Sequence, residues 1–262
     1  MNPHNHGYGA LSIFLSALPF AIVILTYRIL AVISGKRYKP FPPHRYLCWM
    51  LGIWCIALSV TGPLASRAHT DFADHMIIHL LLGMLAPLLL MLAAPMTLLF
   101  RTLSLKQARG LSRLLKSSPF RLLHNPFTAS TLHIGGLWLL YTTDIYSWMH
   151  RSTIGHTGVH VHIFLAGYLF TASMVSIDPA PHRTSFLYRS LVLLIALSAH
   201  GILSKYLYAH PPSGVPAAQA ELGSMIMYYG GDIVDIVLIC ILFSKWFHAA
   251  RPRKALNPVT EK

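Results

Sequence analysis

Apolar residues occur in seven long runs along the chain, and short polar connections separate them. A helix that crosses a bilayer needs about 20 mostly apolar residues, and each run reaches or approaches this length. We expect helices at about 10–33, 46–64, 75–100, 127–146, 159–177, 186–204 and 224–247. No fixed-period repeat and no long linker divides the chain, so residues 1–262 are predicted to form a single all-α membrane domain.

Composition supports this prediction. Hydrophobic residues make up 54% of the 262 residues and charged residues 11%, whereas a soluble domain carries about 25% charged residues. Pro87 and Pro95 interrupt the third run, and each is expected to kink the inner half of that helix because proline lacks a backbone N–H.

The basic residues alternate between the connections. Of the 21 Lys and Arg residues, only Arg67, Arg151 and Lys205 fall on the side that also holds the N-terminus. Because basic residues collect on the cytoplasmic side, we expect seven spans, with the N-terminus outside and the C-terminus cytoplasmic. The basic segment 101–126 is then a cytoplasmic connection with enough leucines to lie along the membrane surface. Anionic lipid thus explains the net charge of +13, and no nucleic-acid partner is predicted.

Histidine and carboxylate residues gather toward the opposite, outer side. Asp71, His75 and His79 recur every four residues, so they share one helix face. His156 and His160 repeat this spacing at the start of the fifth run, whereas His162 points to roughly the opposite face. Ionisable groups at membrane depth are costly and mark functional sites, so a transition-metal site is one interpretation. Histidines bonded to neighbouring backbone are the other.

Further residues are candidates for completing or tuning such a site. His200 lies near the outer end of the sixth run, and the thioether of Met76 suits Cu(I). Carboxylates that could orient the imidazoles from outside the ligand set are Asp71, Asp74, Asp232 and Asp235. The sequence contains no HExxH, GxSxG or Walker phosphate-binding motif, so no enzymatic activity is predicted.

Several segments resemble the CtaG family, which comprises multi-spanning assembly factors for caa-type cytochrome c oxidase. The third run matches with Phe72-Ala-Asp-His-Met-Ile-Ile-His79 and with the Ala-Pro pairs at 86–87 and 94–95. The fifth run matches at His160, Phe164-Leu165 and Tyr168-Leu169-Phe170, and the seventh at Ile226-Met227-Tyr228 and Gly230-Gly231. This chain departs from the family at Tyr141, where the family's fourth-helix histidine aligns, and at Gln219-Ala220, where the family has Asp-Gln.

The resemblance implies that the protein delivers or inserts copper during oxidase maturation. His75, His79 and His160 carry over as the metal ligands, with His156, His162 and His200 as further candidates. The implied partners are cytochrome c oxidase subunits within the bacterial cytoplasmic membrane, and a homodimer that shares the site is left open. A bis-histidine haem protein or redox enzyme, with His79 opposite His160 or His200, and a metal-free assembly scaffold are the alternatives.

Overall fold

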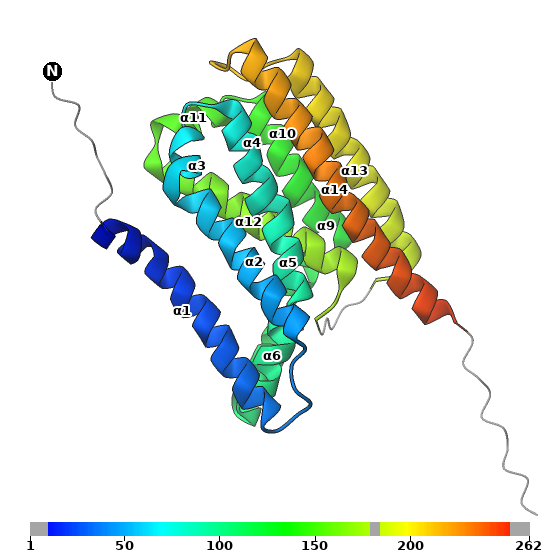
Figure 1. Ribbon diagram of the computed structural model, residues 1–262. Coiled ribbons are helices and arrows are strands. Elements are labelled where there is room, and N and C mark those ends of the chain that lie inside the picture. The colour runs from blue at the N-terminus through cyan, green and yellow to red at the C-terminus, as the bar shows by residue number, and fades with distance from the viewer. Residues whose placement is uncertain (1–9, 179–183, 252–262) are drawn as a thin grey trace, which may run out of the picture.

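The computed structural model describes residues 10–178 and 184–251, and within these ranges the secondary structure is helical, with no strand. Figure 1 shows a bundle of long helices joined by short ones. Its elements are α1 (Ala10–Gly35), α2 (Pro43–Val60), α3 (Gly62–Arg67), α4 (Phe72–Leu80), η1 (Leu81–Leu85), α5 (Ala86–Leu92), α6 (Pro95–Thr102), α7 (Leu105–Leu115), α8 (Ser118–Leu123), α9 (Pro126–Ser130), η2 (Thr131–Gly135), α10 (Gly136–Thr142), α11 (Ile145–Arg151), α12 (Thr153–Val175), α13 (Phe186–Ala209) and α14 (Ala217–Ala250).

Five helical segments are long and apolar enough to cross a membrane, which confirms the all-helical membrane class. They are Leu15–Gly35, Phe72–Leu92, Thr153–Val175, Phe186–Ala209 and Ala217–Ala250. The other two expected spans are also helical but shorter: α2 has 18 residues, and the fourth run forms α9, η2 and α10 in succession. A crossing by these two shorter segments, and the orientation of the termini, stay predictions.

The third span differs from the expected helix at both ends. It begins at Phe72 instead of 75, because the Asp71 side chain accepts hydrogen bonds from the first free backbone N–H groups and caps the helix. It ends at Leu92, since Ala94 adopts a left-handed conformation (φ 51°) before Pro95 starts α6. A single helix over 75–100 was therefore wrong, and Pro95 breaks the segment instead of kinking it.

Pro87 is accommodated by a local change of helix type. Proline has no N–H for the carbonyl of Gly83, and the preceding turn widens into the π-helix η1. On the facing helix α12, a Cβ at Gly167 would overlap the Gly83 carbonyl oxygen. Glycine at 167 therefore lets two helix backbones meet directly, in the way small residues permit in membrane bundles.

The fourth run ends earlier than expected. Helix α10 stops at Thr142, and a separate short helix, α11, carries residues 145–151. Thr142 and Thr143 turn their hydroxyls back to backbone carbonyls four residues earlier. One helix over 127–146 was therefore wrong, and α11 is free to turn and pack against α12.

Most of the basic segment 101–126 forms two short helices, α7 and α8. Ser104 and Gln107 bond reciprocally at the start of α7 and fix its first turn. Leu105, Leu114 and Leu122 are exposed, as expected for helices that lie on a membrane surface.

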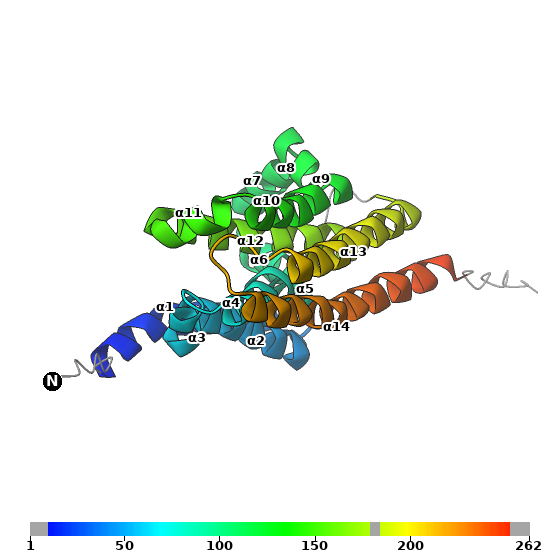
Figure 2. The ribbon, with the colours of Figure 1, turned by 90° about the horizontal axis from the view of Figure 1, so that it is seen from above.

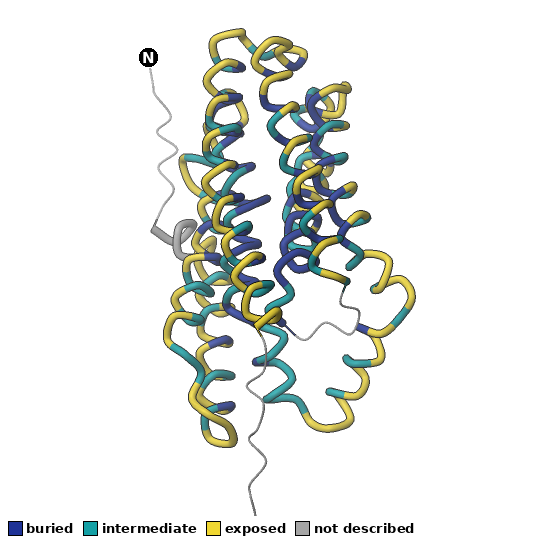
Figure 3. Tube along the Cα trace, turned by 90° about the vertical axis from the view of Figure 1, so that its right-hand side faces the viewer, coloured by how far each residue is buried: buried dark blue, intermediate teal, exposed yellow. Residues whose placement is uncertain are grey.

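The centre of the bundle is the segment α4–η1–α5, which contacts α2, α12 and α14. The view from above in Figure 2 shows α14 beside α4, with α13 in the next layer, and α1 at the periphery. Buried positions concentrate between these layers (Figure 3), and they include Met76, Met174, Leu203 and Met227. Any polar side chain on the inner face of α4 must therefore find its partners inside the protein.

The Gly83–Gly167 contact generates a prediction for stability. Gly167→Ala should destabilise the protein by about 1–3 kcal/mol or more, because the methyl group would push α12 away from η1. Thermal unfolding of the detergent-solubilised protein measures the effect. Gly158→Ala is the control on the same helix, since nothing lies within 4 Å of the added carbon. Equal unfolding temperatures for the two variants would contradict this account of the packing.

Candidate functional site

Five histidines from four segments form a closed circuit of neighbouring imidazoles at the end of the bundle near α3 and α11. Ring centroids are 4.5 Å apart for His69 and His156, and 4.2 Å for His156 and His160. The circuit continues from His160 to His75 at 6.3 Å and from His75 to His150 at 6.2 Å. It closes from His150 to His69 at 6.4 Å. We call these residues the five-histidine cluster.

The five-histidine cluster runs from the surface into the core. His69, on the connection between α3 and α4, is exposed, and His150, His156 and His160 are partly buried. His75 is 2% exposed. The series of imidazoles therefore leads from an exposed residue through partly buried ones to a buried residue on α4.

Backbone hydrogen bonds orient two of these rings. The Nδ1 atoms of His150 and His160 lie 2.9 Å from the carbonyl oxygens of Tyr146 and His156 respectively. A carbonyl oxygen only accepts, so each Nδ1 carries a proton, and Nε2 is the nitrogen left to act as a ligand. Such a bond prepares an imidazole for binding a metal through its other nitrogen.

His75 is held from the fourth helix by Tyr141. Its Nε2 lies 3.1 Å from the Tyr141 hydroxyl, and both side chains are buried. Tyr141 thus stands where the family resemblance led us to look for a histidine, and it supplies a hydrogen-bond partner in that place. The sequence did not predict this role.

The five imidazoles do not converge on one point. Within residues 10–178 and 184–251, no three His, Cys, Asp or Glu side chains are close enough to hold a single metal ion. Two imidazoles at a time are the ligand set that this arrangement offers, and imidazole suits copper. The donor chemistry is therefore of a kind that copper accepts.

His79 has different neighbours from His75, although the two residues are only one helical turn apart on α4. Its nearest imidazole is His200 on α13, with the ring centroids 6.1 Å apart. The Tyr141 ring lies between the two levels, 6.0 Å from His75 and 6.5 Å from His79. The structure thus brings His75 and His160 together but groups His79 with His200.

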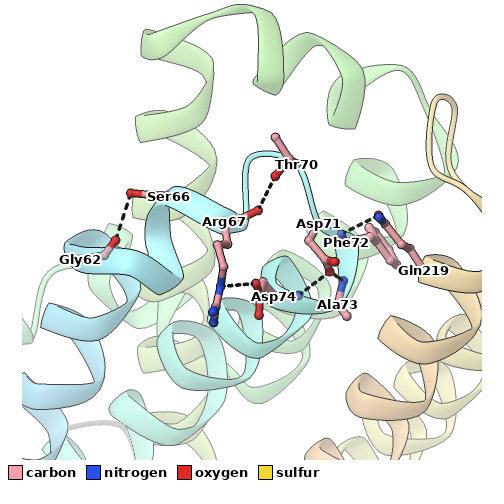
Figure 4. Close-up of polar contacts among 9 residues, drawn as sticks. All are labelled: Gly62, Ser66, Arg67, Thr70, Asp71, Phe72, Ala73, Asp74 and Gln219. Atoms are coloured by element: carbon pink, nitrogen blue, oxygen red, sulfur yellow. Dashed lines mark hydrogen bonds and ion pairs between the residues drawn. The ribbon is translucent and has the colours of Figure 1, made fainter. Parts of the chain in front are cut away.

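The acidic candidates on α4 have structural partners. Asp71 caps the helix, and Asp74 forms an ion pair of 2.8 Å with Arg67 (Figure 4). The Phe72 N–H donates to the Gln219 side chain, which ties the start of α4 to α14. Met76 is fully buried beside Gly223 of α14, so its thioether packs in the core.

Other candidates lie away from the five-histidine cluster. His162 is exposed, with its Nε2 3.2 Å from the Leu132 carbonyl oxygen, and it packs over Gly136. On α14, Asp232 is exposed, whereas Asp235 is 5% exposed on the face that packs inward. Of these three, only Asp235 reaches the interior.

A cavity of about 430 Å³ adjoins the five-histidine cluster. His69, Tyr146 and His150 line one side of it, and the connection between α13 and α14 lines another. Burial, aided by the nearby Asp71 carboxylate, raises the pKa of the Tyr146 hydroxyl, so this group stays protonated. The cavity gives the cluster an approach from the end of the bundle.

Sequence reasoning did not select His69, His150 or Tyr146 as site residues. The spacing of four between Tyr146 and His150 was a usable signal, since it places both on one helix face. The sequence did not select His133 either; it is buried on η2, which packs against the helix of His200. A distance between separate helices cannot be read from spacing along the chain.

Comparison with protein families gives one match. Residues 25–249 match the family described as cytochrome c oxidase caa3 assembly factor. The match covers the C-terminal part of α1, all of α2 to α13 and all but the last residue of α14, and so includes every residue of the five-histidine cluster.

The chain is also similar to longer mycobacterial proteins. It is 28% identical over 230 residues to an uncharacterized protein of Mycobacterium leprae, covering 79% of this chain and 34% of that protein. It is 30% identical over 174 residues to an uncharacterized protein of Mycobacterium bovis, covering 63% and 26%. The chain thus spans about a third or less of the length of these curated relatives, and no solved structure matches it.

The Tyr141–His75 contact predicts a measurable loss of stability. Tyr141→Phe keeps the ring but leaves a buried imidazole nitrogen without its partner, at a cost of about 1–3 kcal/mol. Tyr229→Phe on α14 is the control, since that residue is exposed. Denaturant unfolding of both variants measures the difference, and a Tyr141→Phe protein as stable as the control would contradict the role assigned to this hydroxyl.

Proposed function

Because the chain belongs to the family of cytochrome c oxidase caa3 assembly factors, we propose that it serves oxidase assembly by binding copper and releasing it to an oxidase subunit. The observation that carries the proposal is the five-histidine cluster, which joins exposed His69 to buried His75 through a series of neighbouring imidazoles. The protein acts as a carrier of copper, with no chemical reaction of its own.

The ligand arrangement supports a donor more than a storage site. A structural metal site is a closed cage of four ligands, whereas these imidazoles meet only in pairs. Copper held by two neutral imidazoles keeps open positions through which an incoming ligand can take it over. Pairwise contacts along the five-histidine cluster therefore favour transfer.

The neighbouring cavity supports delivery to a protein partner. It opens beside His69 and His150, with a volume of about 430 Å³. A loop of an oxidase subunit that carries metal ligands fits this position, because it could reach the partly buried rings without unfolding α11 or α12. The partner thus meets copper at the end of the bundle.

The proposal includes a topology. Seven spans in the bacterial cytoplasmic membrane, with the N-terminus outside, put the five-histidine cluster at the outer surface. The basic residues support this orientation, since α7 and α8 carry a dense basic set at the opposite end of the bundle. Lipid headgroups then contact those two helices.

Haem binding is the second candidate function, and packing disfavours it. Gly83 and Gly167 contact each other across η1 and α12, so they leave no room for a macrocycle between these segments. An added carbon at Gly231 would lie 2.6 Å from the His200 ring, so α14 already fills the space beside it. A macrocycle at His79 and His200 would have to separate these helices.

Copper binding at the five-histidine cluster predicts a specific loss of affinity. The double variant His75→Ala, His160→Ala should bind Cu(I) more than about tenfold more weakly than the wild type, since it removes two adjacent imidazoles. Competition with a Cu(I)-selective chelator measures the affinity of the purified protein, prepared with a tag free of histidine. His248→Ala is the control, because this exposed residue lies near the other end of α14.

The same variants test delivery in cells. In a bacterium that makes caa3 oxidase but lacks its own assembly factor, the wild type and His248→Ala should restore the copper content of the purified oxidase. The double variant should not. Full restoration by the double variant would favour a metal-free scaffold, and a haem absorption band in the purified protein would favour the redox alternative.

A further inference from the structure

A second group of histidines lies deeper in the bundle than the five-histidine cluster. His79, His133 and His200 come from α4, η2 and α13, and their exposed fractions are 1%, 3% and 3%. The π-helix η2, which carries His133, packs against α13, which carries His200. We call these residues the deep histidine cluster.

The deep histidine cluster has unused ligand atoms. Among the described residues, both ring nitrogens of His79, Nδ1 of His133 and Nε2 of His200 are buried without a hydrogen-bond partner. A buried polar atom without a partner is destabilising, so several in one place need an explanation. In the five-histidine cluster, by contrast, backbone carbonyls or Tyr141 occupy one nitrogen of three of the rings.

The local backbone makes room for these rings. An added carbon at Gly231 would lie 2.6 Å from the His200 ring, and one at Gly83 would lie 3.5 Å from Nδ1 of His79. The π-helix η1 starts two residues after His79, and η2 contains His133. π-Helical turns often occur at functional sites, and here two of them accompany the same group of side chains.

The distance between the rings of His79 and His200 suits a single metal ion bound between them. The His79 and His200 centroids are 6.1 Å apart. Two imidazoles bound at about 2 Å on opposite sides of an ion have centroids about 6 Å apart. Cu(I) accepts such linear coordination by two neutral nitrogens, and a singly charged ion is the least costly to bury.

We propose that His79 and His200 form a second Cu(I) site within the membrane-embedded core. This proposal rests on the proposed copper-handling function and adds a second, more deeply buried binding site to it. Tyr141 separates the two levels, since its ring contacts both His75 and His79. Asp235 is buried one helical turn beyond Gly231 on the same face of α14, where its carboxylate can offset the charge of the ion.

Cu(I) stoichiometry tests the proposal on the full-length protein in detergent, loaded without oxygen and freed of excess copper. The wild type should hold two ions per chain. His200→Leu should hold one, and His200→Met should keep two, because the Met thioether binds Cu(I) whereas Leu has a similar size and no donor atom. A role in packing alone would make these two variants equal. His210→Ala, at the exposed end of the same helix, is the control and should keep two.

The double variant His75→Ala, His160→Ala, called the outer variant below, distinguishes the proposed function from the proposed second site. His75→Ala, His160→Ala should lose one ion and keep the one at His79 and His200, which X-ray absorption should identify as coordinated by two nitrogens. If His200→Leu binds as much copper as the wild type, the second site is refuted while copper binding at the five-histidine cluster stands. If the outer variant loses all copper, the second site is also refuted. If only His200→Leu loses copper, the five-histidine cluster is the proposal that fails, and a wild type without copper refutes both.

Discussion

The direct contact of two helix backbones at Gly83 and Gly167 is the constraint on which the rest of the arrangement depends. Pro87 cannot bond the Gly83 carbonyl, the turn before it widens, and α12 packs against that carbonyl because residue 167 has no side chain. This approach brings His160 within 6.3 Å of His75. A few ångströms more between the helices would break the His75–His160 contact and open the circuit of imidazoles.

Hydrogen bonding then divides the histidines into two kinds. Near the end of the bundle, backbone carbonyls fix the proton on Nδ1 of His150 and His160, so their Nε2 atoms are prepared as ligands. Deeper in the bundle, both ring nitrogens of His79 and Nε2 of His200 are buried without a hydrogen-bond partner among the described residues. In the proposed function, the first arrangement favours exchange of a bound copper ion, and the second favours its retention.

Much of the fold follows from the sequence, because hydrophobic length and period are local properties. The apolar runs gave helices at every expected place, and the spacing of four put His156 and His160 on one face of α12. The predicted helix boundaries were wrong where a single local contact decides the end of the helix. The Asp71 side chain moves the start of the third span to Phe72, and the left-handed Ala94 stops the helix before Pro95.

The sequence by itself determined that the protein is an all-helical membrane protein and that His75, His79 and His160 are its leading candidates for chemistry. Only the tertiary structure decided which of them meet, because contacts between helices depend on packing angles and on close approaches that no periodicity records. It grouped His79 with His200 instead of His75, and it added His69 and His150 to the five-histidine cluster. It also showed that Asp71 caps α4 and that Asp74 forms an ion pair with Arg67. It also placed Tyr141 against both His75 and His79. The Tyr141 hydroxyl is the hydrogen-bond partner of the buried His75 ring.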